Sequence, residues 1–293
     1  MATEPPLVVI VGPTASGKTR LAIRLAKQFE GEIISADSRA VYRGLDIGTA
    51  KPSAEEQREV PHWGIDIVNP DQRFTAADFQ RYAFGMIGAI RARGNIPFLV
   101  GGTGLYVDSV LYAYQFSSGV DDLDRREMLM GLDLDALHVY CRENNIELPE
   151  NNKNKRYVVN NILRNGAAPM GRGAQLSNAV VVGIATEKSV LHSHIVHRAN
   201  GIFASGVIAE AKSIADEYGW TSEAMTGNIY PLVHDYLDGL MTEDELKQKF
   251  IVQDRRLAKR QNTWFRRNEH IVWLDADSAY TYIAQVLDAY SNS

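Results

Sequence analysis

The residues with the clearest chemical capacity form a short loop near the N-terminus. Gly12 and Gly17 enclose four residues and precede Lys18 and Thr19, in the order Gly-x-x-x-x-Gly-Lys-Thr of a P-loop. The glycines let backbone N–H groups turn inward around an anion, Lys18 adds a mobile positive charge, and the hydroxyl of Thr19 suits Mg²⁺. A helix that begins here adds the positive end of its dipole. The predicted phosphate or diphosphate site consists of Gly12, Pro13, Thr14, Ala15, Ser16, Gly17, Lys18 and Thr19.

A carboxylate follows the next apolar segment. Residues 32–36 predict a strand that ends at Asp37, and in a parallel sheet this edge lies beside the phosphate loop. Nucleotide-hydrolysing P-loop proteins usually place an acid for Mg²⁺ at the end of a later strand. Here residues 96–100 end instead in the glycine-rich turn 101–104. Asp37 is therefore a candidate general base or a candidate metal ligand, and the residues alone leave both open.

The elements that must position these residues follow an α/β pattern. Short apolar runs at 7–11, 32–36, 96–100, 180–184 and 271–274 predict strands, and residues 76–93 have helical spacing between two of them. The sequence therefore predicts an α/β fold, a P-loop NTPase-like parallel sheet flanked by helices.

A polar segment interrupts this pattern. Residues 120–173 are charged and Asn-rich, with Gly and Pro punctuation near the end, and they predict a small, mainly helical insertion domain. We expect a catalytic core with C-terminal helices at 1–118 and 174–293, and the insertion at 119–173.

Composition limits the class of protein. The chain has 293 residues, of which 45% are hydrophobic and 23% charged, and a net charge of −5. No apolar run reaches the roughly 18 residues that a membrane helix needs, and Cys141 is the only cysteine. These features favour a cytoplasmic protein without a disulfide framework. The segment from Lys247 to Arg267 contains eight cations and a single acid, Asp254. This basic segment is either an RNA-binding surface or a solvated helix face.

Several motifs together resemble one family, the tRNA dimethylallyltransferases. The matching stretches are GPTASGKT at 12–19, SADS at 35–38, VYRGLDIGTAKP at 41–52, PH at 61–62, AADF at 76–79, VGGTGLY at 100–106 and AKRQNTWFR at 258–266. They occur in the family's order. The resemblance implies transfer of a dimethylallyl group from dimethylallyl diphosphate to N6 of the adenosine beside the anticodon of tRNA, in a cytoplasmic, monomeric enzyme with Mg²⁺ as cofactor.

The resemblance also assigns catalytic roles. Asp37 would accept the proton or a hydrogen bond from the adenine amino group. Lys18, Thr19 with Mg²⁺, and Arg198 would stabilise the charge that develops on the diphosphate, and Thr103 would bind the leaving oxygen. Arg198 is matched through the pattern HIVHR at 194–198.

A tRNA interface is implied as well, since the adenine must leave its stack to reach Asp37. The predicted tRNA-binding residues are Asp37, Ser38, Arg39, Ala40, Thr103, Arg125, Lys259, Arg260, Gln261, Asn262, Thr263, Trp264, Phe265 and Arg266. Lys153, Lys155 and Arg156 in the insertion are further candidates.

Three alternatives stay open at this point. The chain could prenylate free adenine nucleotides, it could be a P-loop kinase that binds ATP, or it could be a non-catalytic RNA-binding relative. His192, His194 and His197 have crowded spacing, but no acid or cysteine completes a metal site with them, so we interpret them as surface or packing residues.

Overall fold

The computed structural model describes residues 4–116, 123–166, 171 and 173–292, and these form two compact units. The first comprises Met1–Leu111 and Gln175–Ser293, and the second Tyr112–Ala174. The boundary expected at 118 and 119 lies outside the described residues.

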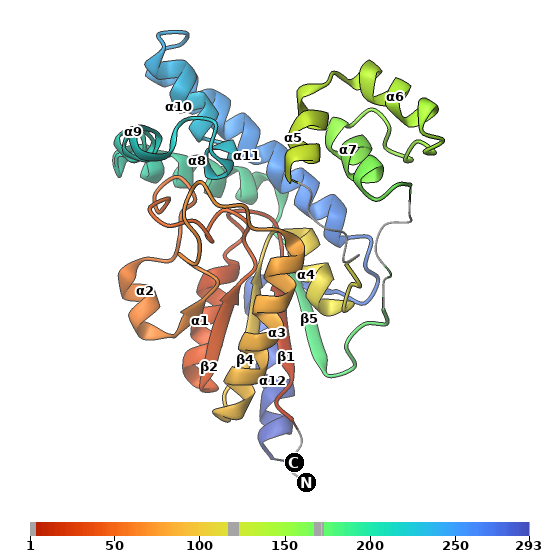
Figure 1. Ribbon diagram of the computed structural model, residues 1–293. Coiled ribbons are helices and arrows are strands. Elements are labelled where there is room, and N and C mark those ends of the chain that lie inside the picture. Colours follow the sequence, from red (N-terminus) through yellow and green to blue (C-terminus); the bar gives the residue numbers. More distant parts are fainter. Residues whose placement is uncertain (1–3, 117–122, 167–170, 172, 293) are drawn as a thin grey trace. The chain divides into compact units, whose positions relative to one another are not determined.

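The first unit is built on a six-stranded, fully parallel sheet (Figure 1). In spatial order its strands are β3 (His62–Trp63), β2 (Gly31–Ser35), β4 (Ile96–Gly101), β1 (Leu7–Val11), β5 (Ala179–Ile184) and β6 (Val272–Leu274). The predicted α/β sheet is therefore confirmed. All five predicted strands are present, and β3 is an additional edge strand of two residues.

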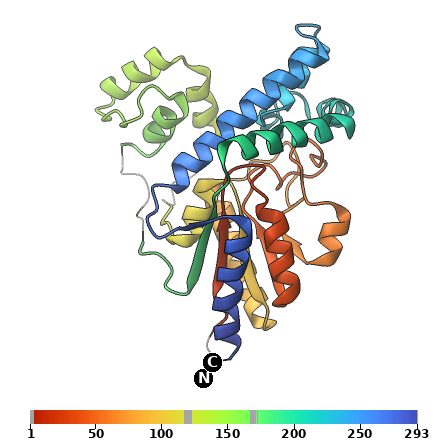
Figure 2. The ribbon, with the colours of Figure 1, turned by 180° about the vertical axis from the view of Figure 1, so that it is seen from behind.

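Helices cover both faces of this sheet. On one face lie α3 (Ala76–Ala92) and α4 (Gly104–Leu111), and on the other, seen from behind in Figure 2, lie α1 (Lys18–Gln28) and α12 (Ala276–Ser291). β1 is buried at all five residues, which explains why its sequence is apolar without alternation.

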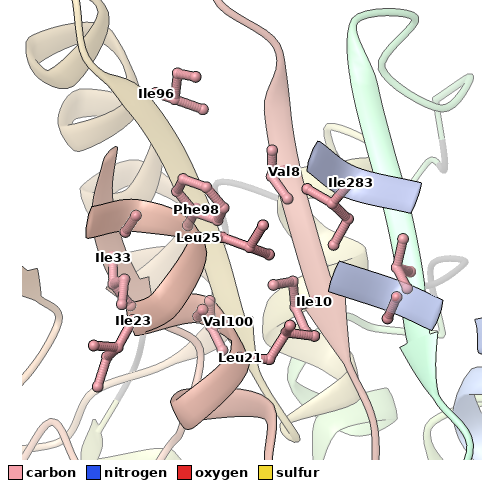
Figure 3. Close-up of a cluster of buried hydrophobic side chains, with 14 of the residues drawn as sticks. Val8, Ile10, Leu21, Ile23, Leu25, Ile33, Ile96, Phe98, Val100 and Ile283 are labelled. Atoms are coloured by element: carbon pink, nitrogen blue, oxygen red, sulfur yellow. The ribbon is translucent and has the colours of Figure 1, made fainter. Parts of the chain in front are cut away.

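The core between the sheet, α1 and α12 fixes the start of α1. Val8 and Ile10 of β1 pack with Leu21 and Leu25 of α1, and Ile283 of α12 joins the same cluster (Figure 3). Because the apolar residues of α1 begin three positions after Lys18, this packing holds the first turn of the helix at the carboxyl end of β1.

The remaining elements of the first unit comprise one short helix beside α1 and a group of helices at the carboxyl ends of the strands (Figure 1). They are α2 (Ala54–Glu59), α8 (Lys188–Ala204), α9 (Val207–Tyr218), a 3₁₀ turn (Glu223–Thr226), α10 (Tyr230–Leu237) and α11 (Glu243–Phe265). α11 begins at a capping box in which Thr242 and Glu245 satisfy each other's backbone N–H groups. It then carries the predicted basic segment along 23 residues.

The second unit is helical, with α5 (Leu123–Gly131), α6 (Leu134–Glu143) and α7 (Lys155–Leu163). It has its own apolar core, which includes Leu129, Leu137, Cys141 and Val158. Among the described helices, none is long and apolar enough to cross a bilayer.

Candidate active site

The P-loop ends in a left-handed glycine at the N-terminus of α1. Gly17 has φ 85°, a left-handed conformation that glycine adopts without strain, and it precedes the first helical residue, Lys18. The Oγ of Ser16 is buried and has no hydrogen-bond partner. Ser16 itself is not among the residues that line the cavity beside this loop.

Lys18 is the mobile charge of this loop. Its Nζ donates to the carbonyl of Pro13 at 2.7 Å. Burial lowers the pKa of Lys18 to about 8, the carboxylate of Asp37 acts in the opposite direction, and Arg198 lowers it further. Lys18, Asp37 and Arg198 are therefore close enough to interact electrostatically, although they are far apart in the sequence.

A cavity of about 550 Å³ joins these residues. Asp37, Thr103, Lys18 and Arg198, the four predicted catalytic residues, all lie on its wall. Five residues of the P-loop motif line it too: Thr14, Ala15, Gly17, Lys18 and Thr19.

Asp37 and Thr103 sit on adjacent turns that are bonded to each other. Asp37 follows β2, and its Oδ1 accepts the backbone N–H of Arg39 at 2.8 Å. Thr103 follows β4, and its Oγ1 accepts the N–H of Ser38 at 3.0 Å. Because β2 and β4 pair directly, the ends of these two strands meet at one edge of the sheet, and the turns hold a carboxylate and a hydroxyl side by side.

Arg198 donates hydrogen bonds to three groups, one of which belongs to the P-loop. It projects from α8 and donates to the hydroxyl of Thr14, to the carbonyl of Thr49 at 3.2 Å, and to Asp254 at 3.3 Å. An arginine fixed in this way is a preorganised donor pair for a diphosphate oxygen.

Asp254 is a functional candidate that the sequence analysis missed. Its side chain is buried on α11 and lines the cavity, where Arg198 and the amide of Asn228, at 3.2 Å, contact it. Burial raises the pKa of Asp254, while Arg198 and Asn228 lower it. The signal available in the sequence was a lone acid within the basic segment, which is typical of an internal ion pair.

The predicted tRNA-binding residues divide by location. Ser38, Arg39, Ala40 and Gln261 lie on the cavity wall with Asp37 and Thr103. Gln261 also accepts the N–H of Thr14 at 2.7 Å, so its amide is engaged with the P-loop.

The rest of the basic segment is partly exposed. Lys259, Arg260, Thr263 and Arg266 are exposed along α11 and at its end, and Asn262 is half-buried. Phe265 is 1% exposed, so the expectation that its ring contacts RNA is wrong: the ring belongs to the core. The half-buried Trp264 donates its indole N–H to Asp108 at 2.8 Å, which favours a packing role for this side chain.

The other candidates outside the cavity have local partners. In the second unit, Arg125 donates to the hydroxyl of Tyr140 at 3.2 Å and Lys155 to the carbonyl of Met130. Lys153 and Arg156 are exposed. His194 contacts the carbonyl of Ala15 at 3.1 Å, next to the P-loop. The described residues hold no group of three or more His, Cys, Asp or Glu side chains that could bind a metal ion.

A parallel sheet, an anion-binding loop between β1 and α1, and a polar cavity at the carboxyl ends of the strands define an α/β protein of the P-loop type. Residues 40–268 match the family described as IPP transferase, and residues 5–63 match a family described as isopentenyl transferase. The chain belongs to the IPP transferase family, as the motif resemblance predicted.

Similar proteins cover nearly the whole chain. The chain is 36% identical to the tRNA dimethylallyltransferase of Geobacillus thermodenitrificans, over 97% of this chain and 95% of that protein. It is also 36% identical to the tRNA dimethylallyltransferase of Bacillus subtilis, over 93% and 91% of the two chains.

Solved structures agree with these relatives. The tRNA isopentenylpyrophosphate transferase of Bacillus halodurans superposes with a TM-score of 0.75 at 36% identity, over 99% of both chains. A eukaryotic dimethylallyltransferase acting on tRNA has a TM-score of 0.76 at 20% identity, over 93% of this chain and 74% of that one, and shows that the fold is shared.

Proposed function

We propose that this chain transfers a dimethylallyl group from dimethylallyl diphosphate to N6 of the adenosine 3′-adjacent to the anticodon in tRNA. The observation that carries the proposal is the common cavity of about 550 Å³, whose wall includes both the phosphate loop with Lys18 and the carboxylate of Asp37. Membership of the IPP transferase family supports the same reaction.

The diphosphate end of the donor would bind at the P-loop. The backbone amides at the start of α1 and the charge of Lys18 would hold its oxygens. As the bond from the allylic carbon to oxygen breaks, negative charge grows on the diphosphate, where Lys18 and Arg198 stabilise it. Because Arg198 is already held by Thr14, Thr49 and Asp254, it needs little reorganisation.

The adenine would enter from the side of Asp37. Its exocyclic nitrogen donates a hydrogen bond to the carboxylate, which removes the proton as the new carbon–nitrogen bond forms. The hydroxyl of Thr103, held by the N–H of Ser38, would contact the departing oxygen. The diphosphate leaves as pyrophosphate, so atoms and charges balance.

The residues present also fit Mg²⁺. Thr19 lines the cavity one position after Lys18, and Mg²⁺ sites of this kind take many of their ligands from phosphate oxygens and water. Thr19 would hold the ion, whose charge would neutralise part of the diphosphate.

The polyanionic partner would be the anticodon stem-loop. The exposed cations Lys259 and Arg260 lie on α11 between the cavity-lining residues Leu257 and Gln261, and they supply positive charge that the net charge of −5 conceals. Contacts from the second unit, through Arg125, Lys153 and Arg156, belong to the same proposal. We further propose that the enzyme acts in the cytoplasm as a monomer, which rests on the family resemblance.

The decisive experiment is nucleoside mass spectrometry. The protein is incubated with Mg²⁺, dimethylallyl diphosphate and an anticodon stem-loop, with parallel reactions on AMP and on ATP alone. We expect prenylated adenosine in the stem-loop only, with Asp37→Ala inactive yet still binding RNA. Prenylated AMP would favour the nucleotide prenyltransferase, and tight binding of ATP without any prenylation would favour the kinase.

A further inference from the structure

Three consecutive backbone amides outside the P-loop converge on one carboxylate. The N–H groups of Asp46, Ile47 and Gly48 donate to Glu210, at 2.8, 2.6 and 2.9 Å. Glu210 lies in the first turn of α9, more than 160 residues away along the chain. Successive amides that point inward form an anion-binding nest, and here an internal side chain fills it.

A buried phenol completes this arrangement. The hydroxyl of Tyr230 donates to Oε1 of Glu210 at 3.0 Å. Burial and the adjacent carboxylate raise the pKa of Tyr230 well above its usual value, so the hydroxyl stays protonated and remains a donor. Gly48 packs closely against the ring of Tyr230. A Cβ at position 48 would lie 2.6 Å from the hydroxyl oxygen of Tyr230, so no larger residue fits there.

The segment that Glu210 holds, residues 46–49, also provides a hydrogen-bond acceptor for Arg198. Thr49 follows the three amides directly, and its carbonyl accepts from Nη2 of Arg198 at 3.2 Å. Gly48 and Thr49 line the cavity with Arg198. The position of this carbonyl therefore depends on the anchor one residue before it.

The other end of the segment has a separate anchor. The Nζ of Lys51, whose side chain is 3% exposed, contacts the carbonyl of Tyr42 at 2.6 Å and Asp46 at 2.7 Å. Lys51 fixes where the segment ends, and Glu210 fixes where its middle lies. Because two separate anchors exist, removal of the Glu210 carboxylate should shift residues 46–49 without unfolding the protein.

We propose that Glu210, with Tyr230, is a positioning residue for the diphosphate donor: it holds residues 46–48, and through the carbonyl of Thr49 it sets the orientation of Arg198. Glu210 does not line the cavity, although its partner Tyr230 does. The proposal rests on the proposed function only in taking Arg198 as a ligand of the donor diphosphate.

Two variants test it. Glu210→Ala removes the acceptor of all these hydrogen bonds and should raise the KM for dimethylallyl diphosphate roughly tenfold or more, with the KM for the stem-loop changed by less than about twofold. Glu210→Gln keeps one acceptor oxygen and should fall between the wild type and the Ala variant. Asp216→Ala removes an exposed carboxylate from the same helix and should behave as the wild type.

Chemical rescue and direct binding separate positioning from a general loss of structure. Formate can refill the nest in Glu210→Ala, so added sodium formate should lower the donor KM, and sodium chloride at the same ionic strength should not. Pyrophosphate affinity, measured by calorimetry without any transfer, should fall in the variant in the same proportion as the donor KM rises.

Two results would contradict a positioning role for Glu210. An unchanged donor KM in Glu210→Ala, or parallel losses for donor and RNA that follow a lower melting temperature and do not respond to formate, would overturn the assignment. A wild-type protein that binds pyrophosphate but transfers no prenyl group would instead contradict the proposed function, while the pyrophosphate measurements on the variants would still test Glu210.

Discussion

Nη1 of Arg198 lies 3.3 Å from Oδ2 of Asp254, and this ion pair forms part of the wall of the candidate active site. The carboxylate is 3% exposed, and its negative charge stands beside the place where we propose that a diphosphate binds. It therefore holds Arg198 in position before the donor arrives, but it also repels the donor. These two effects have opposite consequences for stability and for affinity.

The first prediction separates these effects with Asp254→Asn. In the empty protein, Arg198 loses its counter-charge, and breaking a largely buried pair is destabilising. We expect the melting temperature to fall by several degrees, roughly 2 to 4 °C for each kcal/mol lost. Pyrophosphate should then raise the melting temperature of the variant more than that of the wild type, because its charge replaces that of Asp254.

Thermal unfolding with and without pyrophosphate measures both shifts. Glu269→Gln, at an exposed acid beyond the end of α11, is the matched control and should show the wild-type response. Equal shifts in Asp254→Asn and the wild type would mean that Asp254 has no electrostatic effect on the ligand.

The second prediction concerns pH. The pKa of Lys18 is about 8 in the empty protein, below its ordinary value of 10.5. A bound diphosphate favours the charged form, so binding above pH 8 must take up a proton, and affinity should fall by up to about tenfold per pH unit. The stability effect has the opposite sign: since the folded state binds fewer protons than the unfolded state between pH 8 and 10.5, the empty protein gains stability across this window.

Calorimetric titration with pyrophosphate between about pH 7 and about pH 9.5 gives the affinity profile. Lys18→Arg is the internal standard, because arginine stays charged across this range and the remaining pH dependence is that of pyrophosphate itself. Identical profiles for the two proteins would show that Lys18 is already charged throughout. Lys18→Met should bind weakly at every pH, with a raised melting temperature at neutral pH.

Local sequence patterns were enough to predict the sheet and the P-loop. The apolar run of β1, the glycines of the P-loop and the first turn of α1 are neighbours in the chain, so one motif specifies them together. Asp37 and Thr103 could also be placed, because residues that end parallel strands must lie at the same edge. The strand β3 was missed because its two residues, His62 and Trp63, are too few to show any periodicity.

The long-range partners of the C-terminal helices could not be predicted in this way. Glu210 and Asp254 look like ordinary helix-surface acids, and only the packing of α8, α9 and α11 brings them to residues 46–48 and to Arg198. Phe265 is the opposite case, a residue that was expected at the surface and is buried. It lies in a basic segment, yet its position on the helix turns it into the core.

The third prediction concerns the exposed cations of α11. Replacing Lys259 and Arg260 together by Ala should weaken binding of the stem-loop. It should also reduce the slope of log affinity against log salt, by roughly 0.7 to 0.9 for each RNA phosphate that these side chains neutralise in the wild type. The KM for the diphosphate donor should not change, since neither residue lines the cavity.

Filter binding or fluorescence anisotropy at several salt concentrations provides the slope. Lys27→Ala, at an exposed cation in the last turn of α1, is the control for a general reduction in positive charge. A double variant with the wild-type slope would identify this face of α11 as a solvated surface, the alternative that the sequence left open.

The last prediction concerns Gln261, which the family resemblance assigns to tRNA although its Oε1 accepts the N–H of Thr14 at 2.7 Å. Gln261→Ala leaves a part-buried P-loop amide unpaired and should raise the donor KM several-fold. Gln261→Glu keeps an acceptor for this amide but adds a negative charge on the cavity wall, so it should raise the donor KM further, by roughly tenfold or more. Steady-state kinetics with each substrate varied in turn measures both effects, with Gln248→Ala, at an exposed glutamine of the same helix, as the control. If both variants changed only the KM for the stem-loop, Gln261 would be an RNA contact whose bond to the P-loop gives way when tRNA binds.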